Sequence, residues 1–502
     1  MVDISEEKAF DTVRSPSIPD KPSVVQAKQD PHDDAYIPID AHAERKLVRK
    51  LDLYIIPVVM LLYLLSFLDR VNIGNARLYH LEEDLSITSQ QFNTAVSVLF
   101  ATYIASELPS NLVLKAFRPS RWISSITVAW GVIAMAMGFV NSYPSLIALR
   151  LLLGAVEGGL FPGLAIYLTL FYTKKELALR IGYLFVSAAL AGACGGLLAF
   201  AIGGMDGTEG MSGWRWIFII EGLPTIVLGI AVWWLLADDP QTAFYLNAEE
   251  KRLMDRRRAQ QEGHTRSAEE FHWADVRKGL KDWKVWAFCI ALFGCDTMLY
   301  GYSTFLPTII AALNPSWSNS LVQVLTIPCY ALGAVTYLVV AWLSDRQQRR
   351  GLYTCIFGLV SVVGYALLLS PQSAGVHYTG CFLVAMGLYV VVGLPLAWLP
   401  ANCPRYGKRT TATGLQLSIG NCAGILASFL YPKNQGPRYI RGHAVTLAMV
   451  LWGVLVYACL WFYFARENQK RISGEADARI ADMSTEEVAE LGDESPKFLY
   501  TT

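Results

Sequence analysis

Long apolar runs are the feature that most constrains how this chain can fold. They are roughly 18 to 25 residues long, the length that a helix needs to cross a bilayer core about 30 Å thick. The composition agrees, because 53% of the 502 residues are hydrophobic and only 17% are charged, whereas soluble proteins carry about a quarter charged residues. The sequence therefore predicts an all-α polytopic membrane protein embedded in a lipid bilayer.

Twelve transmembrane helices are expected, in two sets of six that a polar stretch separates. The first set lies near residues 52–75, 92–116, 121–140, 144–171, 181–204 and 215–236. The second set lies near residues 285–312, 321–343, 352–370, 377–399, 410–431 and 443–465. This layout predicts two pseudo-symmetric six-helix bundles. The expected parts are an N-terminal tail (1–50), a first bundle (51–236), a central loop (237–284), a second bundle (285–466) and a C-terminal tail (467–502), with both tails disordered or loosely tethered.

The short loops predict how the chain is oriented in the membrane. Lysines and arginines gather before the first span and in every second loop after it, which favours a cytoplasmic location for both termini and for the central loop. The expected membrane is the plasma membrane. The loop between the last two spans departs from the rule, with Lys433, Arg438 and Arg441 on the outer side. Two explanations remain open: an early helix sets the topology, or these residues form a positive outer mouth that attracts anions.

Several classes of function lack support in the sequence. The nine cysteines lie mostly within apolar runs and form no Cys-x-x-Cys pair, so neither a metal site nor a redox site is expected. The net charge is zero, which argues against a nucleic-acid partner. No nucleophile–base pair indicates an enzyme, and no cofactor is expected.

Ionisable residues inside the apolar spans are the main candidates for a functional site, because a charge at membrane depth costs several kcal/mol. Asp69 and Arg70 stand side by side near the end of the first span, and Arg150 and Glu157 lie seven residues apart on one face of the fourth. Neighbouring residues project about 100° apart on a helix, so at least one of the first two needs a partner elsewhere. We expect Asp69–Arg150 and Arg70–Glu157 relationships that line one polar cavity. The alternative is a charge cluster that only locks helices together.

The residue types suggest a role for each member of this group. Arg70 offers a planar fork to a carboxylate, so Arg70 and Arg150 are candidates for binding an anion. Glu157 lies at mid-membrane beside glycines, a location typical of a carboxylate that exchanges a proton, and Asp69 is its companion in proton coupling. Glu107, nearer the end of the second span, is expected to be structural and to hold a lysine or arginine of a neighbouring loop.

The second half offers fewer polar residues within its spans. Tyr300 and Tyr302, in the seventh span, could supply an aromatic wall and hydroxyl donors to a planar ligand, or could simply pack. Asn421 is an amide in the eleventh span, between two glycines, and needs hydrogen-bond partners. These three residues are predicted to contribute to substrate binding.

Several motifs resemble those of one known family. They are LDRVNIGNA (68–76), RLLLGAVEGGLFPG (150–163), GWRWIFIIEGLP (213–224), WLSDRQQRRG (342–351) and YPKNQGPRYIRG (431–442). Together they resemble the major facilitator superfamily, and more specifically its fungal anion:cation symporter branch, which includes allantoate and nicotinic acid permeases. The resemblance covers nearly the whole chain.

The resemblance implies a fold, a mechanism and further site residues. Two six-helix bundles would surround a central cavity and work by alternating access. Arg70, Arg150 and Glu157 would handle the anion and the proton, with Asn72 as a further substrate-binding residue. Asp345, with Arg346 and Arg349, would latch helices at the cytoplasmic side.

The expected function is secondary active transport, as symport of protons with a small organic anion such as nicotinate or allantoate. One alternative is export, or organelle transport, of a secondary metabolite, because the direction of transport follows the driving force and not the fold. Another is a nutrient receptor that signals through the central loop and tails. These segments are short and contain no recognisable interaction module.

Overall fold

The computed structural model describes residues 39–116, 118–203, 205–262, 272–474, 480, 483 and 485–502. Most of the expected N-terminal tail, residues 1–38, therefore lies outside the described residues. Within the described part, every regular element is a helix.

The helices fall into the two expected sets. The first set contains α1 (Ala41–Leu78), α3 (Ser89–Ala116), α4 (Pro119–Met137), α5 (Tyr143–Glu157), α6 (Leu160–Phe171), α7 (Lys174–Gly203) and α8 (Gly213–Leu235). The second set contains α12 (Trp283–Leu313), α13 (Asn319–Gln347), α14 (Arg350–Leu369), α15 (Ala374–Ala401), α16 (Tyr406–Ala427) and α17 (Ile440–Ile472). Shorter elements are α2 (Leu81–Asp84), η2 (Thr208–Gly210), α9 (Ala248–Glu262), α11 (Trp273–Lys281), η3 (Lys433–Gln435), α18 (Thr485–Glu490) and η5 (Gly492–Glu494).

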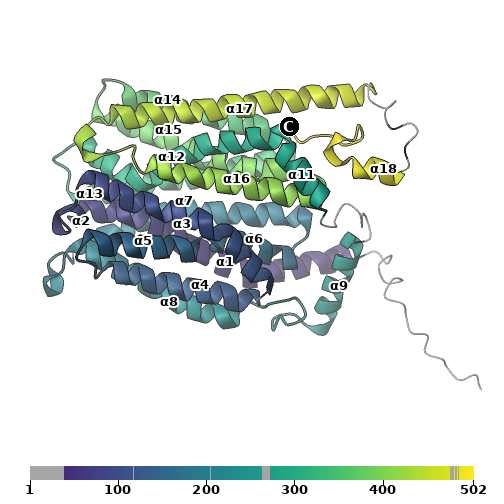
Figure 1. The fold of residues 1–502 in the computed structure, drawn as a ribbon, viewed down its shortest axis with the longest axis horizontal. Helices are drawn as coiled ribbons and strands as arrows, with labels where there is room; N and C mark the ends of the chain where they lie inside the picture. The colour runs from purple at the N-terminus through teal and green to yellow at the C-terminus, as the bar shows by residue number, and fades with distance from the viewer. Residues whose placement is uncertain are drawn as a thin grey trace, which may run out of the picture. The chain divides into compact units, whose positions relative to one another are not determined.

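Among the described residues, nine helical stretches are individually long and apolar enough to cross a membrane, with α5 and α6 counted together. The remaining long helices, α3, α4 and α16, pack against α5, α8 and α12 and complete two bundles of six. In Figure 1 the helices of both bundles run side by side, with α2 at the left end and α9, α11 and α18 at the right end. These ends are called the α2 end and the α9 end below.

The main contacts between the two bundles join α1 with α12, α3 with α16, and α7 with α13. The bundles approach closely at Gly74 of α1, where a Cβ atom would overlap the carbonyl of Thr304 on α12. A small residue at such a crossing lets two backbones approach closely. Arg70 and Tyr300, each one turn from this contact on its own helix, line the same pocket.

The fourth span, expected as one continuous helix, is interrupted. α5 ends at Glu157, and α6 begins at Leu160 after Gly158 and Gly159. Gly154 and Gly158 lie directly against α3, where a Cβ atom on either would overlap the backbone carbonyl of Leu99 or of Tyr103, respectively. Because α3 packs this tightly on the glycines, the side chain of Glu157 is fixed at the interruption, in the interior of the first bundle.

The C-terminal tail corrects the expectation of a loosely tethered segment. α17 continues to Ile472, and the last residues return to the second bundle. Asp493 forms ion pairs with Lys284 (2.6 Å) and Lys408 (2.7 Å), and the ring of Tyr500 stacks on Phe464 with 4.5 Å between centroids. The composition of this segment suggested disorder. Composition could not reveal these contacts, because they join residues that are distant in sequence.

Candidate substrate cavity

An ion pair between α1 and α5 forms the centre of the candidate site. The Nε and Nη2 atoms of Arg70 each lie 2.8 Å from Oε1 of Glu157. Ser66, one turn earlier on α1, donates a hydrogen bond to the same oxygen. The side chain of Glu157 is fully buried, and that of Arg70 is 10% exposed. The structure thus contains the expected Arg70–Glu157 pair, in which a planar guanidinium directs two donors at one carboxylate.

The second expected pair, Asp69 with Arg150, is not a direct contact. Asp69 accepts a hydrogen bond from the indole of Trp130 on α4. Asp69 and Arg150 attract each other electrostatically, but no ion pair joins them within the described part of the chain. The reason is geometric: Asp69 and Arg70 project about 100° apart, so one faces α4 while the other faces α5. Arg150 is 1% exposed, and its Nε and Nη2 have no hydrogen-bond partner among the described residues.

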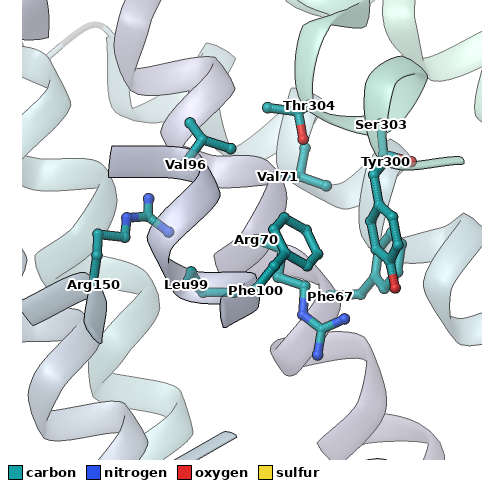
Figure 2. Close-up of a pocket in the computed structure, with 10 residues that line it drawn as sticks. All are labelled: Phe67, Arg70, Val71, Val96, Leu99, Phe100, Arg150, Tyr300, Ser303 and Thr304. Atoms are coloured by element: carbon teal, nitrogen blue, oxygen red, sulfur yellow. The ribbon is translucent and has the colours of Figure 1, made fainter. Parts of the chain in front are cut away.

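Two adjoining pockets surround Arg70 between the bundles. Phe67, Arg70 and Tyr300 line both of them. Figure 2 shows the first pocket, in which Arg70 lies between Arg150 on one side and Tyr300 on the other. The cavity of the second pocket measures about 40 Å³, well below the roughly 300 Å³ or more of a typical small-molecule site, so a substrate requires the bundles to move apart around Arg70. Its walls also include Asn421 of α16 and Asp296 of α12, so both bundles contribute polar groups.

Aromatic rings hold the polar groups of the cavity in place. The guanidinium carbon of Arg70 lies 4.5 Å from the ring centroid of Tyr103, a cation–π arrangement. The ring of Tyr300 packs edge-on against Phe100 at 4.6 Å, and its hydroxyl donates to Oδ1 of Asn421 at 2.5 Å. Tyr300 and Asn421, both predicted to bind substrate, are therefore brought together in the cavity wall.

Two other predicted binding residues line neither pocket. Asn72 is fully buried and donates a hydrogen bond to Glu221 on α8. Tyr302 is also fully buried and donates to the carbonyl of Cys381 at 2.8 Å. Residues two positions apart on a helix project about 200° apart, so each lies on the opposite side of its helix from a cavity residue, Arg70 or Tyr300.

Glu107 has a different partner from the one expected. Its carboxylate accepts a hydrogen bond from Ser418 of α16 at 3.4 Å and interacts with Asn421. Its partners among the described residues lie on α16, because α3 crosses α16 at this level and places Glu107 against the second bundle, and they do not include the expected lysine or arginine of a loop.

The predicted gating residues lie at the junction of α13 and α14. Asp345 accepts a hydrogen bond from Nη2 of Arg350 at 3.2 Å, and Arg350 also donates to the carbonyl of Ala397 on α15. Arg346 instead lies over the ring of Trp342, and Arg349 directly precedes α14. The hydrogen-bonded partner of Asp345 is thus Arg350, a neighbouring arginine of the same motif that was not among the predicted gating residues.

Sequence reasoning missed a polar closure between the bundles at the α2 end. Arg77, 2% exposed, donates to Glu82 (2.9 Å), to Ser89 (2.8 Å) and to the carbonyl of Tyr431 (3.2 Å) in the second bundle. Lys433 forms ion pairs with Glu82 at 2.6 Å and with Glu83 at 2.9 Å. Lys433 is therefore neutralised across the bundles, which weakens the idea of a positive mouth. We call Arg77, Glu82, Glu83 and Lys433 the α2-end closure.

Comparison with known proteins identifies the family. Residues 59–428 match the Major Facilitator Superfamily. This chain belongs to that family. It is 41% identical over 439 residues to an uncharacterized transporter of Schizosaccharomyces pombe, covering 87% of each chain. It is 33% identical over 473 residues to the high-affinity nicotinic acid transporter of Saccharomyces cerevisiae, covering 93% of this chain and 87% of the relative.

A solved structure shows the same fold. The inward-facing, unoccupied form of a bacterial homolog of the human lysosomal transporter Spinster matches with a TM-score of 0.64 and 16% identity, covering 82% of this chain and 96% of that one. The predicted fold, twelve membrane helices in two six-helix bundles, is therefore confirmed. The chain is a multi-pass membrane protein, and its family consists of transporters, not of enzymes.

Proposed function

We propose that this protein is a proton-coupled symporter that carries a small monocarboxylate, such as nicotinate or allantoate, by alternating access. The single observation that carries the proposal is the buried Arg70–Glu157 pair in the cavity between the bundles. One member is a permanent cation and the other can exchange a proton.

The pair supports coupling through charge balance. An arginine in the membrane interior is costly unless an anion accompanies it. While Glu157 is ionised, it supplies that anion and occupies Nε and Nη2 of Arg70. Once Glu157 is protonated, the guanidinium needs another anion, and a substrate carboxylate satisfies it with the same two donors. Proton and anion therefore enter the site together.

Other groups have supporting roles in this proposal. Arg150, with two unpartnered nitrogens, adds positive potential at the first pocket, and Asp69 contributes to proton handling through its electrostatic link to Arg150. Tyr300 and Asn421 contact the organic part of the substrate. Asp345, with the neighbouring arginines at 346, 349 and 350, stabilises the second bundle at the cytoplasmic side during the conformational change.

The sequence and the relatives support a direction of transport and a location. The basic loops favour a cytoplasmic α9 end, and the α2 end then faces outward. The similarity to the yeast high-affinity nicotinic acid transporter supports uptake of a monocarboxylate at the plasma membrane.

The test is uptake of labelled nicotinate and labelled allantoate by yeast cells that lack their own permeases for both. We expect accumulation at external pH 5 that is weaker at pH 7 and collapses with a protonophore. Arg70→Gln, present at the cell surface in equal amount, is the matched control and should not accumulate substrate. Uptake that ignores the protonophore would overturn proton coupling, and failure to transport either compound would overturn the proposed substrates.

A further inference from the structure

Asp296 of α12 is a second acidic group in the cavity, and the proposed coupling reaction does not use it. It lines the same pocket as Arg70 but belongs to the other bundle. The residue is 5% exposed, and its Oδ1 atom has no hydrogen-bond partner among the described residues. Its Oδ2 lies against Gly420 of α16, where any Cβ atom would overlap it, so the glycine makes room for the carboxylate.

The surroundings of Asp296 contain no counter-charge of its own. The described side chains that share its pocket wall are mostly apolar or aromatic, and the one cation among them, Arg70, is already paired with Glu157. The hydroxyl of Tyr389, in the same wall, also lacks a hydrogen-bond partner within the described part of the chain. A buried polar atom without a partner is costly, and it is usually found where something absent from the structure completes it.

We propose that Asp296 is a specificity-determining residue that selects carboxylates bearing a nitrogen hydrogen-bond donor. This inference rests on the proposed function, because the substrate carboxylate is taken to bind Arg70. A protonated ring nitrogen, an amine or a ureide N–H on the same molecule then donates to Oδ1 of Asp296. The pocket would thus bind both polar ends of its substrate, one through Arg70 of the first bundle and the other through Asp296 of the second.

This arrangement predicts strong discrimination between otherwise similar molecules. A site built to hydrogen-bond an N–H group rejects an analogue that lacks it, because the buried protein group is then left unpaired. A methyl group has nearly the shape of an amino group but cannot donate a hydrogen bond. Amino- and methylbenzoates substituted at the same ring position are therefore matched probes.

The experiment measures binding to the purified full-length protein at pH 5, by ligand-induced thermal stabilisation. The probes are 3- and 4-aminobenzoate, the corresponding methylbenzoates, nicotinate, benzoate and allantoate. We expect the nitrogen-bearing member of a matched pair to bind about tenfold more tightly, because the methyl analogue leaves the buried oxygen of Asp296 unpaired. Asp296→Leu should remove this preference, so that the two members of each matched pair bind alike.

Two further variants keep the outcome interpretable. Asp296→Ala removes the acceptor without adding bulk and protects against loss of folding in the leucine variant; it should also reduce the preference. Tyr302→Phe, a buried change on the same helix away from the pockets, should retain it. Equal affinities within the matched pairs for the wild type would overturn the inference. A preference that persists in both Asp296 variants would do the same. In either case, binding that depends on Arg70 would still support the proposed function. Failure of wild type to bind any carboxylate would overturn both.

Discussion

At the scale of the residue, the hydrogen bonds to Glu157 are unevenly distributed between its two oxygens. Ser66 and both donor atoms of Arg70 all bind Oε1. Oε2 is buried and has no partner among the described residues. A proton can therefore be added at Oε2 without first breaking the bonds at Oε1. The added proton removes the negative charge that holds Arg70, which is the change that the proposed coupling needs.

Glu157→Gln should separate the proton-coupled step from substrate exchange. The amide oxygen can still accept from Ser66 and Arg70, but the side chain can no longer ionise. We expect pH-driven accumulation to be abolished while exchange of internal for external substrate continues. Uptake and counterflow in reconstituted vesicles measure the two activities. Glu221→Gln changes another buried acid, one that binds Asn72 outside the pockets, and serves as the control. Equal loss of both activities in Glu157→Gln would contradict the assignment.

Arg70→Lys tests the planar fork separately from the charge. Lysine retains a positive charge but cannot present two parallel donors to a carboxylate. It also loses the stacking of a planar group on Tyr103. We expect the apparent KM for the anion to rise by about tenfold, equivalent to ~1.4 kcal/mol, measured by concentration-dependent uptake at pH 5. An unchanged KM would show that Arg70 acts only as a charge.

At the scale of the element, the last residues of the chain form part of the second bundle. Asn402, which directly follows α15, pairs with both the N–H (2.8 Å) and the carbonyl (3.2 Å) of Thr501. Asn468 of α17 pairs in the same way with the backbone of Tyr500, at 2.8 Å for each bond. Each of these two amide side chains thus donates one hydrogen bond to the backbone of the tail and accepts one from it. The tail joins α12, α15, α16 and α17 at the α9 end.

Asp493→Asn should weaken this attachment. Burial alone would raise the pKa of Asp493, but attraction by Lys284 and Lys408 holds that pKa below its usual value of 3.8. A group whose pKa is lowered in the folded state contributes stability that is lost only as the pH falls through that lowered pKa. The ion pairs therefore persist at both pH 5 and pH 7. We expect a similar decrease in apparent melting temperature at both values, from a loss of about 3 kcal/mol.

The neighbouring residue provides the control for this prediction. Glu494→Gln makes the same change of charge at an exposed position of the same turn. It should leave the melting temperature of the detergent-solubilised protein nearly unchanged. If both variants have the same melting temperature, or if Asp493→Asn has that of the wild type, the tail does not contribute to the stability of the second bundle.

At the scale of the whole molecule, the sequence predicted what depends on the bilayer and missed what depends on packing. The number and grouping of the spans followed from hydrophobic length, which the membrane sets directly. The rotation of each helix about its own axis did not follow from hydrophobic length, because glycines and neighbouring helices determine it. This is why Arg70 and Tyr300 face the cavity while Asn72 and Tyr302, two positions further along, do not.

Contacts between residues far apart in sequence could not be predicted from sequence patterns either. Arg77 near the end of the first span looks like an ordinary interfacial arginine, yet it binds the carbonyl of Tyr431. Glu82 and Lys433 look like loop charges, yet they pair across the bundles. No periodicity relates residues more than 300 positions apart, so these contacts emerge only from the assembled fold.

The α2-end closure should control the balance between the two access states of the transporter. Alternating access requires the bundles to separate at one end while they meet at the other. Burial alone would raise the pKa of Glu83, but the hydrogen bond from Lys433 holds that pKa below its usual value. Stability from Glu83 is therefore present at pH 5 and pH 7, and is lost only as pH falls through the lowered pKa. The closure then acts as a structural contact, and not as the pH sensor.

Lys433→Gln should accordingly shift the population toward molecules open at the α2 end at either pH. An exposed ion pair contributes about 1 kcal/mol or less, so two pairs change the ratio of open to closed states by roughly fivefold. Spin labels at Gln90 and Asn434, exposed positions in the two bundles at this end, report the separation by pulsed dipolar spectroscopy. Lys281→Gln, at the α9 end, is the control. The closure joins the bundles only when they meet at the α2 end. Identical distance distributions in the two variants would therefore mean that packing of α1 on α12 and of α7 on α13 holds the closed state without it.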